Sequence, residues 1–267
     1  MRILYGPVPS WRLGRSLGVD PLGSGIKRCT YDCVYCQLGR TPGGPVRSGA
    51  WADPSALADE LRATAHVPVD YVTFAGMGEP TLASNLGELL QVARATRKSR
   101  LAVLTNASLL GDPDVRAALS LADCVVAKLD AADEEAFLSI NRPRIPCSLS
   151  EVVGGIRDFR KGFAGHLALQ IMFLAGNTVQ AEQLAALVRS LQPDEVQLNT
   201  PLRPSPEPPL QPAAMAVVVR SFEGLPVHQV YAAPRPTVVA LDPVATRQRR
   251  PEYGGPRCTS SVQSCTR

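Results

Sequence analysis

Short apolar runs alternate along the chain with longer amphipathic stretches. Within the runs, apolar residues follow one another almost without interruption, as in parallel strands that are covered on both faces. These runs predict strands at residues 16–20, 70–75, 101–105, 124–129, 167–173, 195–199 and 227–231. The stretches between them predict helices at residues 54–65, 85–98, 112–120, 133–140, 150–161, 179–191 and 212–223.

Residues at the ends of the predicted helices support this division. Asp53 precedes Pro54, which combines a favourable N-cap with proline at the first helical position. Arg97 and Lys98 stand in the last turn of the second predicted helix, where positive charge complements the helix dipole. The β–α alternation predicts an α/β fold with a parallel sheet. Because the units are too few for a complete eight-unit barrel, we expect a partial (β/α)6 TIM-like barrel.

The composition changes near residue 200. The last 67 residues hold 12 of the 24 prolines, and six of these lie within residues 201–212. Proline removes a backbone donor and fixes φ, so this segment predicts an extended connector. We therefore expect a core at residues 1–200 and a Pro-rich C-terminal extension at residues 201–267. The extension either packs on the core or is partly disordered.

Charge is unevenly distributed over the 267 residues. Charged residues make up 19% and hydrophobic residues 45%, a composition that excludes a disordered chain. Residues 1–50 and 201–267 carry net charges of +5 and +4, whereas residues 51–200 carry −5. The basic ends suit an anionic partner, and the alternative is that they form solvated loops.

The sequence also bears on the compartment. Residues 1–10 lack the basic start and apolar run of a secretory signal, and no apolar stretch has the character of a membrane span. We therefore expect a cytoplasmic protein with no membrane partner. Seven cysteines in such a protein predict metal binding or catalysis rather than disulfides.

Three of the cysteines crowd into the segment CTYDCVYC, with the spacing C-x3-C-x2-C. Cys29, Cys33 and Cys36 are suited to hold one face of a [4Fe–4S] cluster and to leave one iron open, although most such clusters have four cysteine ligands. Structural zinc is the alternative, but it requires four closed ligands. The partners for zinc would have to be Cys258 and Cys265, far along the chain.

This motif and its surroundings resemble the radical S-adenosylmethionine (radical SAM) superfamily over roughly residues 5–205. The opening YGPVPSWRLGRSLGVDPLGSGIKRCTYDCVYCQLG is similar to a subgroup of Fe–S oxidoreductases that is distantly related to wybutosine-synthesis enzymes. In that subgroup arginine often stands where this chain has Trp11. This difference affects expected substrate contacts and leaves the cysteine motif intact.

The resemblance implies an oxidoreductase or transferase with two cofactors, a [4Fe–4S] cluster and S-adenosylmethionine. Reductive cleavage of S-adenosylmethionine would give a 5′-deoxyadenosyl radical that modifies an unidentified substrate: RNA, a peptide or a small molecule. An electron donor such as flavodoxin or ferredoxin is implied as a partner. Two alternatives remain open: transfer of the aminocarboxypropyl group, and an Fe–S or zinc protein with a redox-sensing or adaptor role.

The segment AGMGEP, which follows a predicted strand, resembles the family motif that binds the amino group of S-adenosylmethionine, although Met77 separates its glycines. The resemblance assigns Gly76, Gly78 and Glu79 to this cofactor, and the alternative is a glycine turn. Polar residues also end later strands. Their expected role is to line the cofactor or substrate pocket, and they are Asn106, Lys128, Asp130 and Asn199.

Lys128 and Asp130 fall on the same face of a strand, so a structural ion pair is the alternative to a cofactor contact. Arg203 follows Asn199 and is expected at the same end of the sheet. The tail cysteines Cys258 and Cys265 are candidates for an auxiliary metal or redox site, and the alternative is two free thiols.

Overall fold

The computed structural model describes residues 2–23 and 25–252. Its strands form one eight-stranded sheet in the order of the chain. The bounds are β1 (Leu4–Ser10), β2 (Gly14–Val19), β3 (Tyr71–Phe74), β4 (Arg100–Thr105), β5 (Cys124–Lys128), β6 (His166–Met172), β7 (Glu195–Asn199) and β8 (Val227–Gln229). Strands β2 to β8 are all parallel, and β1 pairs antiparallel with β2.

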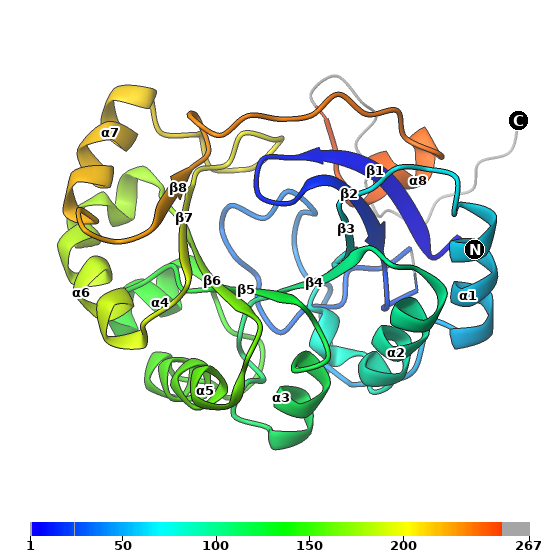
Figure 1. Cartoon of the computed structure of the whole chain (residues 1–267). Helices are drawn as coiled ribbons and strands as arrows, with labels where there is room; N and C mark the ends of the chain where they lie inside the picture. The colour runs from blue at the N-terminus through cyan, green and yellow to red at the C-terminus, as the bar shows by residue number, and fades with distance from the viewer. Residues whose placement is uncertain (1, 24, 253–267) are drawn as a thin grey trace, which may run out of the picture.

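Helices connect the parallel strands. They are α1 (Pro54–Ala63), α2 (Leu86–Thr96), α3 (Pro113–Leu119), α4 (Glu134–Ile140), α5 (Leu149–Gly162), α6 (Ala181–Leu191), α7 (Pro212–Ser221) and α8 (Pro243–Arg249), with 3-10 turns η1 (Pro80–Leu82) and η2 (Ala175–Gln180). Figure 1 shows the sheet curled into an open arc with the helices of the β–α units on its outer side. The predicted partial barrel is confirmed. No helix among residues 2–23 and 25–252 is long and apolar enough to cross a membrane.

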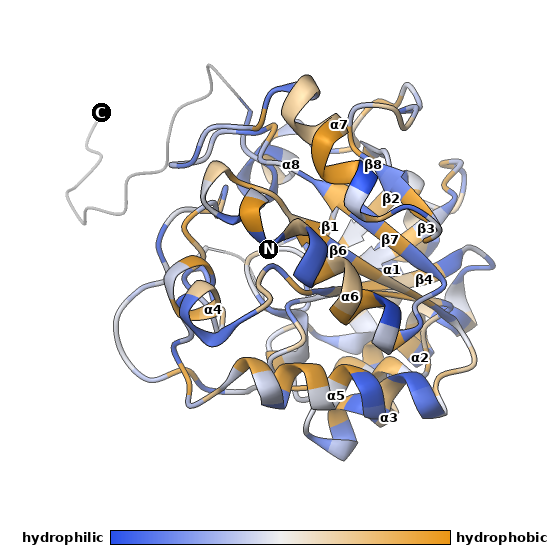
Figure 2. Cartoon of the chain, turned by 90° about the vertical axis from the view of Figure 1, so that its left-hand side faces the viewer, coloured by the Kyte–Doolittle hydropathy of each residue, from blue (hydrophilic) through white to orange (hydrophobic). Residues whose placement is uncertain are grey.

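The two faces of the sheet have different environments. Alternate strand residues such as Leu17, Val72 and Leu169 belong to the main core, which they share with buried leucines of the helices. The strand residues between them point to the inside of the arc, where Ser16 and Thr73 form a hydrogen bond of 2.7 Å. Figure 2 shows hydrophobic residues concentrated in the central strands, while α5 carries both hydrophobic and hydrophilic positions.

The helix ends follow the capping chemistry in the sequence. Asp53 accepts a hydrogen bond from the amide of Ala56 at 2.8 Å and so caps α1, as predicted. Ser148 and Glu151 form a reciprocal capping box at the start of α5. These local interactions define where the β–α units begin, and hence where each strand end is positioned.

Two elements were not predicted from the sequence. Strand β1 contains Gly6, Pro7 and Pro9, which disfavour a central strand. It forms because it lies at the edge of the sheet, where one side of its backbone needs no strand partner. Helix α8 is only seven residues long and packs beside β1, so its stability depends on tertiary contact that periodicity does not reveal.

The chain after residue 200 returns along the open side of the arc. After α7 and β8, the segment coloured orange in Figure 1 crosses from β8 to α8 beside β1. The Gly6 amide donates to Thr246 Oγ1 at 2.9 Å, which attaches α8 to this edge strand. The division of the chain at residue 200 stays a prediction. Cys258 and Cys265 lie outside the described residues.

Candidate cofactor site at the carboxyl ends of the strands

The three clustered cysteines lie on one loop that follows β2. The loop belongs to no helix, and its second half turns through a hydrogen bond from the Cys36 amide to the Cys33 carbonyl at 3.1 Å. Cys29, Cys33 and Cys36 are half-buried and form no disulfide. In the view of Figure 1, the segment between β2 and α1 projects within the arc of the sheet.

Backbone hydrogen bonds hold this cysteine loop on two sides. The Arg28 amide donates to the Met77 carbonyl, and the Glu79 amide donates to the Arg28 carbonyl, both at 2.8 Å. On the other side, the Val34 amide donates to the Ile140 carbonyl at 2.9 Å. The loop is therefore fixed between the segment after β3 and the end of α4.

The two glycines of the segment after β3 are required by close packing. Gly76 and Gly78 have φ values of +119° and +149°, which L side chains rarely adopt. A Cβ atom on Gly76 would lie 2.5 Å from the Asp20 carboxylate, and one on Gly78 would overlap the Arg28 carbonyl oxygen. These glycines therefore bring the motif against the cysteine loop, whatever cofactor contacts they make.

Glu79 organises the end of the next strand. Its carboxylate accepts hydrogen bonds from the hydroxyls of Thr81 and Thr105, at 2.6 and 2.7 Å, and from the Asn106 amide at 2.6 Å. Burial raises the pKa of Glu79, and these hydrogen bonds oppose that shift. Because Glu79 is only 2% exposed, the structure shows a positioning role, and the predicted contact with S-adenosylmethionine stays a prediction.

Asp130 organises the opposite side of the loop. Its carboxylate accepts hydrogen bonds from the Tyr35 hydroxyl, from Asn141 Nδ2 at 2.8 Å and from the Met172 amide at 2.8 Å. Lys128 Nζ lies 3.3 Å from the same carboxylate and 4.9 Å from the centre of the Tyr35 ring. The expected Lys128–Asp130 ion pair is therefore present, and it supports the loop through Tyr35.

Two asparagine amides reach the cysteine sulfurs. Asn106 Nδ2 donates to Cys29 Sγ and Asn141 Nδ2 donates to Cys33 Sγ, both at 3.6 Å. Burial, and then the nearby Glu79 carboxylate, raise the pKa of Cys29. Burial, and then the Asp130 carboxylate, raise the pKa of Cys33 to about 11. Cys29 and Cys33 are therefore neutral thiols in the free loop, and metal binding must release their protons.

The donor set fits an iron–sulfur cluster. Three thiols on one loop, two of them with amide donors at sulfur, match the ligands and hydrogen bonds that such clusters use. Within the described residues, no three His, Cys, Asp or Glu side chains converge on a position for a single ion. Since each cysteine of a cluster binds a different iron, this spacing suits a cluster better than one tetrahedral zinc.

Several predicted residues meet at one recess beside the loop. The recess has a volume of only about 10 Å³, room for about one water molecule, and its polar lining includes Tyr31, Asn106, Lys128, Asp130 and Asn141. Asn199 pairs in register with Met172 on the neighbouring strand and does not line this recess. The structure thus brings together three of the four predicted strand-end residues.

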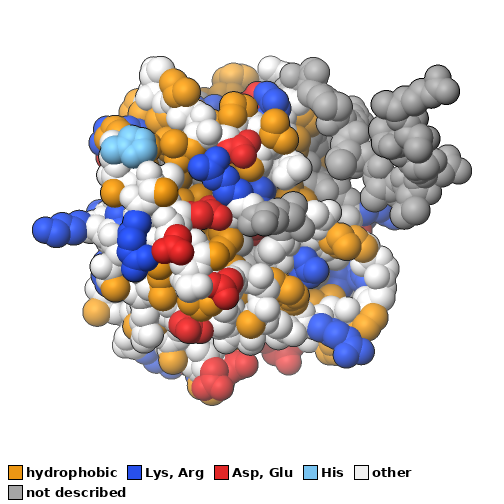
Figure 3. All heavy atoms as spheres, turned by 90° about the vertical axis from the view of Figure 1, so that its right-hand side faces the viewer, with side chains coloured by type: hydrophobic (Ala, Val, Ile, Leu, Met, Phe, Trp, Pro, Cys, Tyr) orange, Lys and Arg blue, Asp and Glu red, His pale blue; other side chains and the backbone are white. Residues whose placement is uncertain are grey.

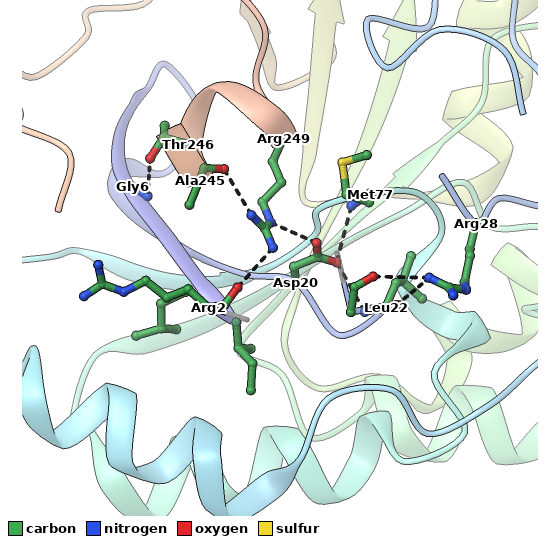
Figure 4. Close-up of polar contacts among 12 residues, drawn as sticks. Arg2, Gly6, Asp20, Leu22, Arg28, Met77, Ala245, Thr246 and Arg249 are labelled. Carbon is green, nitrogen blue, oxygen red and sulfur yellow. Dashed lines mark hydrogen bonds and ion pairs between the residues drawn. The ribbon is translucent and has the colours of Figure 1, made fainter. Parts of the chain in front are cut away.

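A buried ion pair connects the C-terminal helix to this site. Arg249 Nε of α8 donates to Asp20 Oδ2 at 2.8 Å, while Asp20 Oδ1 accepts from the amides of Leu22 and Met77 at 3.2 and 3.4 Å. Figure 4 shows the Arg249 side chain pointing from α8 to Asp20, with Met77 on the opposite side of the carboxylate. Met77 lies between the two motif glycines, so α8 helps to position that motif.

The Pro-rich segment also touches the cysteine loop. Arg203 donates to Gln37 Oε1 at 2.8 Å, and the Ser205 hydroxyl donates to the Tyr35 carbonyl at 3.0 Å. Gln37 in turn donates to the Arg249 carbonyl at 3.4 Å. The loop is therefore enclosed by chain from both halves of the protein.

Sequence reasoning missed three residues that support this site: Asp20, Asn141 and Arg249. Asn141 lies in the segment INRPR, directly after the helix predicted at residues 133–140. A signal for Asn141 was available, since it directly ends a predicted helix. Asp20 and Arg249 are 229 positions apart, and no local pattern connects them.

The sequence has basic end segments and an acidic middle segment, but the surface in Figure 3 shows no matching division of charge. Basic and acidic side chains are interspersed there with hydrophobic ones. The basic and acidic segments therefore do not separate into one-signed surfaces on that face.

The chain matches known proteins over most of its length. The family model of the Radical SAM superfamily matches residues 24–188. A UPF0026 protein of Synechocystis sp. is 43% identical over 205 residues, which cover 76% of this chain and 77% of that protein. A UPF0026 protein of Methanocaldococcus jannaschii is 34% identical over 227 residues, which cover 82% and 70%.

Solved structures share the fold at low identity. Native anSMEcpe with bound AdoMet gives a TM-score of 0.62 at 19% identity, covering 81% of this chain and 64% of that one. Streptococcus suis SuiB bound to precursor peptide SuiA gives 0.61 at 13% identity, covering 82% of this chain and 49% of SuiB. This chain thus spans about half of SuiB. The kinship with wybutosine-synthesis enzymes stays a prediction. Since the matched segment exceeds half of the chain and contains all three clustered cysteines, the protein belongs to the radical SAM superfamily.

Proposed function

We propose that this protein is a radical SAM enzyme in which Cys29, Cys33 and Cys36 hold a [4Fe–4S] cluster. When bound, the cluster supplies one electron for reductive cleavage of S-adenosylmethionine to methionine and a 5′-deoxyadenosyl radical, which abstracts hydrogen from the substrate. Members of the superfamily are enzymes, and this chain retains the three-cysteine motif within the matched segment. We also propose a cytoplasmic location and an external electron donor such as flavodoxin or ferredoxin.

One observation carries the proposal: the cysteine loop is attached to three strand-end segments by hydrogen bonds. Glu79 and Asn106 hold the Cys29 side, while Asp130 and Asn141 hold the Cys33 side. Such attachment keeps the three sulfurs at fixed positions, as a multi-iron ligand requires.

The polar groups at the strand ends beside the cysteine loop are the proposed contacts for S-adenosylmethionine. Gly76, Gly78 and Glu79 remain the proposed contacts for its amino group beside the cysteine loop, and Lys128 is proposed to supply a positive charge for its carboxylate. Asn106 and Asn199 remain proposed contacts from β4 and β7. The substrate lies within or above the arc of the sheet. A peptide substrate has a precedent in SuiB, which was solved with its precursor peptide.

The experiment is anaerobic reconstitution with iron and sulfide, followed by S-adenosylmethionine and dithionite. Mass analysis of the nucleoside product is expected to find 5′-deoxyadenosine, and Cys33→Ala is expected to abolish it. Cys124→Ala is the matched control, because Cys124 lies on β5 and is packed among apolar side chains. Its product yield should stay within about twofold of the unchanged protein.

Other products would overturn parts of the proposal. 5′-Methylthioadenosine would indicate aminocarboxypropyl transfer instead. A complete cluster that never cleaves S-adenosylmethionine, with candidate substrates present, would favour redox sensing. A protein that takes up zinc and no iron would end the radical interpretation.

A further inference from the structure

Lys27 is a buried lysine that lies shortly before Cys29 in the chain. Its side chain is only 4% exposed, and its Nζ donates to the Gly39 carbonyl at 2.7 Å. Gly39 follows shortly after Cys36, and its amide donates to the Cys36 carbonyl at 3.0 Å. One side chain therefore joins the two ends of the segment that contains all three clustered cysteines.

Gly39 has the backbone conformation that this contact requires. Its φ of +76° lies in the left-handed region, which glycine adopts without strain. A Cβ atom at this position would meet nothing within 4 Å, so the backbone angle favours glycine here and crowding does not. The turn at residues 36–39 thus ends with a carbonyl oxygen that accepts from Lys27.

The Lys27 ammonium has no close carboxylate within residues 2–23 and 25–252. Asp32 Oδ1 lies 3.9 Å from its Nζ, which is too far for a hydrogen bond. The same oxygen accepts from the Thr41 amide at 2.6 Å, and Asp32 Oδ2 lies 4.0 Å from Arg40 Nε. A buried ammonium whose one hydrogen bond goes to a neutral carbonyl costs stability unless negative charge lies close to it.

The other buried ions do not supply that charge to Lys27. Five charged side chains in the described part of the chain are buried: Asp20, Lys27, Glu79, Asp130 and Arg249. Arg249 is paired with Asp20, so Lys27 is the buried cation that remains. The thiolate ligands of a cluster carry negative charge, and reduction of the cluster adds one more electron. The charge of Lys27 is therefore best compensated when a reduced cluster occupies the loop.

We propose that Lys27 is a positioning residue for the cluster: its hydrogen bond to Gly39 closes the cysteine loop, and its charge favours the reduced form. This inference rests on the proposed function. It gives the Cys36 end of the loop a support of its own, since Asn106 and Asn141 reach the sulfurs of the other two cysteines. A cation near a cluster raises its reduction potential, so Lys27 eases acceptance of the electron from the external donor.

The first test is a redox titration of the reconstituted full-length protein, followed by electron paramagnetic resonance. Lys27→Gln removes the charge and retains an amide donor. We expect the equilibrium constant for cluster reduction to fall about tenfold, which is a shift of about 59 mV to more negative potential for one electron. Lys27→Arg keeps the charge and should retain the potential.

Arg40→Gln is the matched control for the titration. Arg40 lies near the same Asp32 carboxylate, but its side chain is 84% exposed. Water and salt screen a charge in that position, so its removal should leave the potential unchanged.

The second test needs no cluster. Hydrogen exchange of the metal-free full-length protein, followed by mass spectrometry, measures how readily the turn at residues 36–39 opens. Lys27→Met removes both the donor and the charge, so exchange in this turn should accelerate roughly tenfold. Exchange in α2 should stay unchanged, and Arg40→Met should match the unchanged protein in both segments.

An unchanged potential in Lys27→Gln, or an equal shift in Arg40→Gln, would overturn the inference. If Lys27→Gln takes up no iron, Lys27→Arg decides: full iron uptake supports the need for a cation, and no uptake overturns it. If the unchanged protein takes up no iron, the proposed function fails, and hydrogen exchange alone decides. Faster exchange in Lys27→Met then supports closure of the loop by Lys27, and equal exchange overturns it.

Discussion

Arg249 and Asp20 form a buried ion pair between two ends of the chain, with Arg249 Nε 2.8 Å from Asp20 Oδ2. Both residues are at most 2% exposed. The same Asp20 carboxylate accepts a hydrogen bond from the Met77 amide, so the pair joins α8 to the glycine motif. The C-terminal helix is thereby part of the architecture that shapes the cofactor site.

We predict that Arg249→Met destabilises the protein by about 3–5 kcal/mol, because it leaves the Asp20 carboxylate buried without its cation. Urea unfolding followed by circular dichroism measures this change. Arg247→Met on the same helix is the control, since Arg247 is exposed, and its stability should change by less than about 0.5 kcal/mol. Equal effects of the two substitutions would contradict a specific role for the pair.

Two glycines should respond to alanine in opposite directions. Gly78→Ala forces a side chain at φ +149° and into the Arg28 carbonyl, so we expect a loss of at least about 1–2 kcal/mol from the backbone alone. Gly154→Ala, inside α5 with open space around it, should gain up to about 1 kcal/mol.

Iron content after reconstitution provides a second way to compare the two glycine variants. Gly78→Ala displaces the cysteine loop and should reduce iron per chain, whereas Gly154→Ala should retain it. Full iron content in Gly78→Ala would show that the close approach of the two loops is dispensable.

The two asparagines at the sulfurs should tune the bound cluster. Hydrogen bonds to cluster sulfurs stabilise the more negative, reduced state, so Asn106→Ala and Asn141→Ala should each make the reduction potential more negative. A redox titration followed by electron paramagnetic resonance measures this shift. Asn85→Ala is the control, because Asn85 bonds to the Ala52 carbonyl instead. Unchanged potentials in both variants would refute the contacts.

Stability should fall in acid because of two aspartates at the amino ends of strands. Burial opposes the shift, but hydrogen bonds from Arg94 and from the Leu101 amide lower the pKa of Asp123. The pKa of Asp194 is likewise lowered against burial by the Leu167 amide and by Arg160. When the pKa of a carboxyl group is lower in the folded state than in the unfolded state, its ionised form stabilises the fold. This contribution is complete at pH values above the pKa of the unfolded state, near 3.9, and it is lost as the pH falls through the pKa of the folded state.

Unfolding free energies measured by urea between pH 5 and pH 2 check this expectation. Asp123→Asn and Asp194→Asn should each reduce the pH dependence below about pH 4. Asp114→Asn should leave it unchanged, since Asp114 is exposed and forms no ion pair with a described residue. A steeper dependence in either of the first two variants would contradict the sign.

Local patterns in the sequence were sufficient for much of the fold. The seven predicted strands and seven predicted helices all correspond to observed elements, because each apolar run is long enough to show its period and four of the seven helices begin at a side-chain cap. The cysteine spacing was equally local, and it led directly to the family. What local patterns missed was β1 and α8, which are stable only against each other and the sheet edge.

The candidate site, like the fold, could be predicted in part from local sequence patterns. The sequence by itself determined the cysteine motif and the polar strand ends, since parallel strands bring their carboxyl ends together. Only the tertiary structure decided that Glu79 and Asp130 are used within the chain, that Asn141 reaches Cys33, and that Arg249 pairs with Asp20. Those relationships depend on side chains that meet across the curled sheet, and the distance between them in sequence carries no information about their distance in space.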